Sequence, residues 1–118
     1  MKSAALLALL AFPAAAQQAE GLVDARAAEL RGLDKIAGVS TDIPVSVGQT
    51  AAFGALKVTL KACRYPSDDP SSNAYAYVVI SEPDGKVAFD GWMIASSPAL
   101  SALDHARYDI WVVRCSTN

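Results

Sequence analysis

The residues best equipped for chemistry lie close together near the end of the chain. Two serines supply hydroxyls, the single histidine supplies an imidazole and two aspartates supply carboxylates: Ser96, Ser97, His105, Asp104 and Asp109. These are the residue types of a nucleophile, a general base and an orienting acid. The chain has no Gly-x-Ser-x-Gly nucleophile elbow, however, and all five residues fall in one short segment. We therefore expect no catalytic residues. The alternative is a hydrolase or ligand-binding protein that uses His105 and Asp104.

The serines have a second explanation as the start of a helix. Ser96-Ser97-Pro98 has the pattern of an N-cap followed by proline at the first helical position, which predicts a short helical insertion over residues 99–103. Asp104 and His105 would then end this helix. There the imidazole could interact with terminal carbonyls or bond a neighbouring aspartate, so we expect both residues to be structural.

Metal and thiol chemistry find little support in the sequence. The two cysteines have no Cys-x-x-Cys spacing, and a single histidine is too few for common zinc sites. The acidic loop that contains Asp68 and Asp69 lacks the alternating oxygen ligands of a calcium-binding loop. We therefore expect no metal site and no cofactor.

The N-terminal residues predict export. Lys2 precedes an apolar run from Ala4 to Phe12, and a proline and small residues follow it up to Ala16. This is the pattern of a secretory signal peptide over residues 1–16, cleaved after Ala16. The run is shorter than the roughly 20 residues of a membrane-spanning helix. We expect a periplasmic protein with no transmembrane segment in the mature chain.

The charge distribution argues against nucleic acid as a partner. Removing Lys2 with the signal peptide leaves nine basic residues against twelve acidic ones, without a run of one sign. Binding to phosphates needs a concentrated basic patch.

The two cysteines predict a cross-link instead. In an exported chain with no thiol left over, Cys63 and Cys115 are expected to form a disulfide. A mature domain of about 100 residues has a small core, so such a cross-link adds substantially to its stability. We expect a signal peptide, a leader over residues 17–32 and a single disulfide-linked β domain over residues 33–118.

Alternating apolar residues predict a mainly β fold from Leu33 onward. Leu56, Val58, Leu60 and Ala62 share one face of a strand, while lysines and a threonine occupy the other. Ser81 to Gly85 has the composition of a hairpin turn. The expected strands cover residues 43–47, 55–62, 75–80, 86–89 and 110–115. They predict a small antiparallel β-sandwich or barrel.

The segment before this domain has a different composition. Residues 20–31 are rich in Ala, Leu, Arg and Glu, which favour helix, and Leu22, Arg26 and Leu30 would share one helical face. We expect a short N-terminal helix or a flexible leader.

The aromatic and arginine residues point to binding as the function. Trp, Tyr and Arg dominate the energetics of protein interfaces, and Tyr75 and Tyr77 share one face of a strand. Within the segment from Trp92 to Tyr108, the interaction candidates are Trp92, Ser97, Pro98, Asp104, His105, Arg107 and Tyr108. Core packing is the alternative for the aromatic residues.

Several segments together resemble a known family. They are Gly32-Leu-Asp-Lys-Ile-Ala-Gly38, Phe53-Gly-Ala-Leu56, Cys63, Gly91-Trp-Met-Ile-Ala-Ser-Ser-Pro98 with the residues up to His105, and Tyr108-Asp-Ile-Trp111 up to Cys115. On these residues the chain resembles domain of unknown function family 2155, small exported proteins of alphaproteobacteria. The resemblance implies no established activity. It implies genes beside an accessory subunit of respiratory complex I, and hence a non-catalytic accessory module. The expected partner is an envelope or inner-membrane protein, with a respiratory complex as one candidate.

The disulfide gives the first prediction. Replacing Cys63 and Cys115 together by Ala should lower the free energy of unfolding by about 4 kcal/mol in the chain-entropy model, because the cross-link closes a loop of about 53 residues in the unfolded chain. Urea denaturation of the oxidised protein and the double variant measures the difference. Two alkylatable thiols in native, unreduced protein taken from the oxidising compartment would refute the cross-link.

Overall fold

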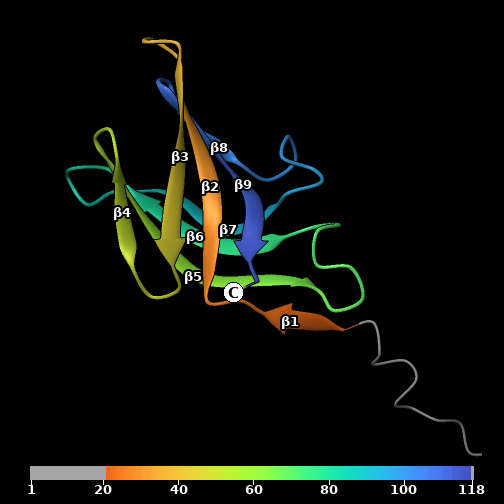
Figure 1. Cartoon of the computed structure of the whole chain (residues 1–118). Helices are drawn as coiled ribbons and strands as arrows, with labels where there is room; N and C mark the ends of the chain where they lie inside the picture. The colour runs from red at the N-terminus through yellow and green to blue at the C-terminus, as the bar shows by residue number, and fades with distance from the viewer. Residues whose placement is uncertain (1–20, 118) are drawn as a thin grey trace, which may run out of the picture.

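The computed structural model describes residues 21–117, which contain nine strands and no helix (Figure 1). In chain order the strands are β1 (Leu22–Asp24), β2 (Ala27–Asp34), β3 (Val39–Ser46), β4 (Thr50–Phe53), β5 (Leu56–Pro66), β6 (Tyr75–Ser81), β7 (Val87–Ile94), β8 (Leu103–Asp104) and β9 (Tyr108–Ser116). The expected signal peptide and residues 17–20 of the expected leader lie outside the described residues. Within residues 21–117 no helix is long and apolar enough to cross a membrane.

The strands form two antiparallel sheets that pack face to face. The first, sheet A, has the order β1-β5-β6-β7, with β4 paired to another part of β5. The second, sheet B, has the order β3-β2-β9-β8. The strands of the two sheets cross one another, and the buried side chains lie between them (Figure 1). The mainly β, sandwich-like arrangement expected from the alternation of apolar residues is therefore present.

The alternation of buried and outward side chains is regular along β6, a central strand of sheet A. In β6 the side chains of Ala76, Val78 and Ile80 are fully buried, whereas Tyr75 and Tyr77 point to the other face. The β6–β7 hairpin closes where the sequence predicts a turn, since Glu82 N–H donates to the Lys86 carbonyl and Gly85 N–H to the Glu82 carbonyl. Each of the five expected strands is present, with bounds shifted by up to five residues.

A β-bulge changes which residue of β5 enters the core. The sequence predicts that Ala62 continues the buried face, but pairing with β6 skips Lys61. An extra residue reverses the alternation beyond it. Ala62 is therefore only half-buried, and Cys63 is turned into the core.

A second β-bulge lies in β9. Its pairing with β2 skips Val113, so the alternation reverses and Cys115 is buried instead of Arg114. Cys63 and Cys115 are joined by a disulfide, with their Cα atoms 5.8 Å apart. This separation lies within the normal range for disulfides. The bond links β5 of sheet A to β9 of sheet B.

Aromatic rings packed on glycines join the sheets near the start of β9. The nearest atom of the Phe53 ring lies 2.5 Å from where a Cβ on Gly32 would be, and the ring centroid is 5.4 Å from that of Tyr108. Tyr108 in turn lies against Gly54, and its hydroxyl accepts a hydrogen bond from Ala55 N–H at 3.3 Å. Both glycines are needed because a side chain there would occupy the volume of a ring.

The expected helical insertion is absent. Residues 97–101 form tight turns, in which Leu100 N–H donates to the Ser97 carbonyl, and Leu103 enters strand β8. Leu103 is buried opposite Ile110. A helix this short depends on tertiary packing, and the tertiary contacts here favour a turn and a strand.

The expected N-terminal helix is also absent. Residues 27–34 form β2, and Ala28, Leu30 and Gly32 are buried at intervals of two. The helix propensity of this Ala-rich segment is overridden by pairing with β3 and β9. The residues from Leu22 to Gly32 thus belong to the sheets rather than to a separate leader.

Gly54 provides a test of this packing. A Cβ at Gly54 would lie 2.4 Å from the Tyr108 hydroxyl oxygen, and its φ of 56° is left-handed. Gly54→Ala should lower the free energy of unfolding by about 2–4 kcal/mol through backbone strain and overpacking. Gly85→Ala is the matched control, since Gly85 also has a positive φ but no atom within 4 Å. Urea denaturation that shows equal losses for the two variants would contradict the packing role.

Candidate functional site

The structure separates the interaction candidates instead of forming one surface from them. Trp92 is 38% exposed on sheet A, whereas Tyr108 is 6% exposed and packs inside the domain. Pro98 and Asp104 are exposed, and Ser97 and His105 are half-buried. Arg107 is exposed but engaged in an ion pair. The candidates lie in three separate places: a polar corner, an aromatic sheet face and a loop beside β9.

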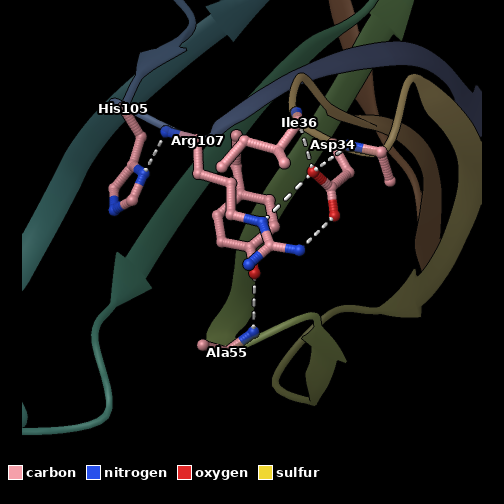
Figure 2. A network of polar contacts seen from close by, with 7 residues as sticks. Asp34, Ile36, Ala55, His105 and Arg107 are labelled. Carbon is pink, nitrogen blue, oxygen red and sulfur yellow. Dashed lines mark hydrogen bonds and ion pairs between the residues drawn. The ribbon is translucent and has the colours of Figure 1, made fainter.

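The polar corner forms around Asp34 at the end of β2 (Figure 2). Its carboxylate accepts hydrogen bonds from Arg107 Nη2 at 2.9 Å and Arg107 Nε at 3.1 Å. It also accepts the backbone N–H groups of Ile36 and Ala37 at 3.0 and 3.1 Å. One carboxylate thus closes the β2–β3 turn and fixes the β8–β9 turn to it.

These bonds perturb the titration of both charged groups. The Arg107 guanidinium, together with the two backbone donors, lowers the pKa of Asp34 from 3.8 to about 2. The Asp34 carboxylate in turn raises the pKa of Arg107. The Asp34 side chain is only 18% exposed, so water screens the pair less than it screens a fully exposed ion pair.

His105 belongs to the same corner. Its Nδ1 accepts a hydrogen bond from Arg107 N–H at 3.0 Å (Figure 2). Its Nε2 lies 3.4 Å from Glu82 Oε1. An accepting Nδ1 requires the proton on Nε2, which can then donate to Glu82. The partner of His105 is therefore neither a helix terminus nor an aspartate, as the sequence suggested, but a glutamate of the β6–β7 turn.

The corner lacks the arrangement of a nucleophile and a base. Among residues 21–117, the hydrogen bonds of the His105 side chain involve Glu82 and the Arg107 backbone, and none reaches a serine. Ser96 instead bonds Asn73, and Ser101 bonds the Trp92 carbonyl. In the same range, no three His, Cys, Asp or Glu side chains gather as a metal site would require.

The sequence did not predict the contacts that Asp34, Glu82 and Asn73 make. Asp34 precedes a turn that ends at Gly38, where φ is 71°, and an aspartate that begins a turn is a recognisable local signal. Its bond to Arg107 spans 73 residues and has no local signal. Asn73 accepts the N–H groups of Ala74 and Ser96, which ties the loop after β5 to the loop after β7.

The aromatic face is the outer surface of sheet A, formed by Arg64, Tyr75, Tyr77 and Trp92. Tyr77 and Trp92 are directly opposite on β6 and β7, with their ring centroids 5.2 Å apart in an edge-to-face arrangement. The Arg64 guanidinium lies 5.3 Å from the Trp92 ring centroid. This face therefore combines the residue types that contribute most at interfaces.

The loop between β7 and β8 borders a cavity on sheet B. The cavity has a volume of about 420 Å³ and is lined by Pro98, Ala99, Ala102, Asp104, Asp109 and Trp111, among others. A larger cavity of about 460 Å³ lies at the other end of β9, lined by the ion-paired side chains of Glu29 and Arg114 among others. The first cavity contains two of the sequence-predicted candidates, Pro98 and Asp104.

Asp34→Asn tests the polar corner. Asparagine can keep the two turn hydrogen bonds but not the charge, so we expect a less stable protein at neutral pH. A lowered folded-state pKa stabilises the fold above the ordinary pKa and loses this effect as pH falls. The stability gap should therefore close between about pH 4 and pH 2.

Chemical denaturation across this pH range measures the gap. Asp24→Asn is the control, because Asp24 forms a single exposed ion pair with Arg64 at 3.0 Å. An NMR titration midpoint of Asp34 near 3.8 would contradict the assignment.

Comparison with known proteins gives the family. Residues 28–115 match a family described as uncharacterized proteins conserved in bacteria, domain of unknown function 2155. An uncharacterized protein of Rickettsia prowazekii is 32% identical over 87 residues, which cover 70% of this chain and 56% of the Rickettsia protein. The chain thus spans little more than half of that relative, and no solved structure matches it. Because the family match extends from β2 to Cys115, the chain belongs to the domain of unknown function 2155 family.

Proposed function

We propose that this protein is an exported, non-catalytic interaction module of the bacterial cell envelope that docks on an envelope or inner-membrane protein. The observation that carries the proposal is the exposure of Trp92 on a sheet face that also presents Tyr75, Tyr77 and Arg64. Single exposed apolar residues are normal on protein surfaces. An exposed tryptophan within an aromatic and arginine cluster is the composition of an interface centre.

The aromatic face is held rigid before any partner binds. The Tyr77 hydroxyl donates to Asp90, and this bond raises the pKa of Tyr77, so the hydroxyl stays protonated. Arg64 is held between Asp24 and the Trp92 ring. Side chains that are already ordered lose little conformational entropy on docking, which favours affinity.

Export is supported by two features. The sequence of residues 1–16 has the pattern of a signal peptide. The Cys63–Cys115 disulfide suits the oxidising periplasm better than the reducing cytosol.

The module would reach a membrane protein from the aqueous side. Polar groups surround the aromatic face, with Asp24 and Asp90 at its edges and Asn73 bonded to the Tyr75 hydroxyl. A polar rim around an aromatic centre is the usual anatomy of a protein interface. This arrangement favours a protein partner over the lipid surface itself.

Trp92→Ala tests this proposal. The mature, oxidised protein is immobilised and incubated with detergent-solubilised envelope, and the retained proteins are compared by quantitative mass spectrometry. Loss of a centrally placed tryptophan should weaken binding of the specific partner about 30-fold or more. Ile36→Ala is the matched control, because Ile36 is 74% exposed in the β2–β3 turn.

A second measurement follows Trp92 directly. Trp111→Phe leaves Trp92 as the only tryptophan, so its fluorescence reports on the aromatic face alone. Partner binding should shift its emission to shorter wavelength, because the ring leaves water. An identical partner set for wild type and Trp92→Ala, with unchanged emission, would exclude this face as the dock.

A further inference from the structure

Strand β9 has an unpaired edge beside the short strand β8. On one side, β9 pairs with β2 along its whole length. On the other side, β8 pairs only with Asp109 and Ile110, which leaves Trp111–Ser116 without a strand neighbour among residues 21–117. Native proteins protect such edges with proline, charged side chains, β-bulges or a covering loop. This edge has no proline, and its one charged side chain, Arg114, is paired with Glu29, but the bulge at Val113 lies within it.

The edge is accessible at both ends. The cavity of about 420 Å³ lies against Trp111, with Pro98, Ala99 and Ala102 of the loop after β7 on its other side. A second cavity of about 440 Å³ lies against Val113, Arg114 and Cys115, with Pro70 and Ser71 of the loop after β5 beside it. Figure 1 shows these two loops on the same side of β9. We call the unpaired edge, with one cavity at each of its ends, the trough.

The charges at the upper end of the trough select a basic group. Asp104 and Asp109 are directly opposite one another on β8 and β9, an arrangement of like charges that destabilises a sheet. The Asp109 carboxylate lies 3.4 Å from Lys35 Nζ, whereas the Asp104 side chain has no ion pair or hydrogen bond with any residue in 21–117. Trp111 lines the same cavity, and an indole ring attracts a cation.

The geometry points to a strand-accepting site: an extended peptide segment of another protein adds to the free edge of β9, with a lysine or arginine side chain between Asp104, Asp109 and Trp111. In this binding mode, backbone hydrogen bonds supply affinity and side-chain pockets supply specificity. The free segment of six residues offers about 20 Å of strand.

A single peptide suits the trough better than a second folded copy. Neighbouring strands lie about 4.8 Å apart, so the sheet of a second copy would have to enter between the two loops. A peptide strand has no such bulk. The site is also separate from the aromatic face, since Trp92 lines neither cavity.

The test uses the mature, oxidised protein and a phage-displayed library of random seven-residue peptides as the probe. Enriched peptides should carry Lys or Arg at one fixed position, with β-branched or aromatic residues at alternate positions. A synthetic copy of the most enriched peptide should slow amide hydrogen exchange within Trp111–Ser116. Asp104→Asn should weaken the binding of this peptide about threefold to tenfold. The Asp104 side chain is exposed and forms no hydrogen bond with any residue that the structure describes, so the variant should still fold.

Two variants separate this site from other effects. Asp68→Asn makes the same charge change in the loop after β5 and should leave the affinity within about twofold, provided that binding depends on the local pocket rather than on net charge. Trp92→Ala should leave peptide binding unchanged, so the strand site and the aromatic face can fail independently.

Several results would overturn the proposal. One is a library that yields no binding peptide, and another is a peptide whose protection falls outside β8 and β9. Equal weakening of peptide binding by Asp104→Asn and Asp68→Asn would show that the loss of affinity comes from net charge and not from the local pocket. Protection of Trp111–Ser116 that rises with protein concentration, without peptide, would assign the edge to a second copy of the chain.

Discussion

The fold depends on a register shift in each sheet. Strict alternation would place Cys63 and Cys115 on the faces that point away from the core. One extra residue in each strand, Lys61 in β5 and Val113 in β9, reverses the alternation just before the cysteine. Both thiols thereby become core groups and join two sheets that share no strand pairing among residues 21–117. A cross-link between sheets restricts the unfolded chain and also fixes how the sheets stack.

The opposite end of β9 is held by packing and charge instead of a covalent bond. Tyr108 fills the space over Gly54, and the neighbouring Arg107 binds Asp34 across the sheet end. Residues that carry the family resemblance, such as Gly32, Phe53 and Tyr108, meet here although they are far apart in sequence. The resemblance therefore reflects, at least in this corner, the requirements of packing. His105 lies in the same corner, where its ring contacts Glu82 and accepts a hydrogen bond from the Arg107 backbone.

The sequence predicts the features that depend on neighbouring residues. Alternation identifies β6 and most of β5, turn residues identify the β6–β7 hairpin, and the two cysteines point to each other. The sequence does not predict the features that depend on contacts between residues far apart in the chain. The Ala-rich segment of β2 favours helix until β3 and β9 pair with it, and neither bulge has a local signal. The Asp34–Arg107 pair, central to the polar corner, likewise joins residues that only the folded sheet brings together.

The two attachments of β9 bear on its capacity to bind. With Tyr108 fixed by ring packing at one end and Cys115 by the disulfide at the other, the unpaired edge between them is ordered before a partner arrives. Strand addition to such an edge costs mainly the ordering of the incoming peptide. If the disulfide is reduced, one attachment is lost and the edge must be ordered during binding. A strand-accepting site of this construction would therefore bind best in the oxidising compartment in which the disulfide forms.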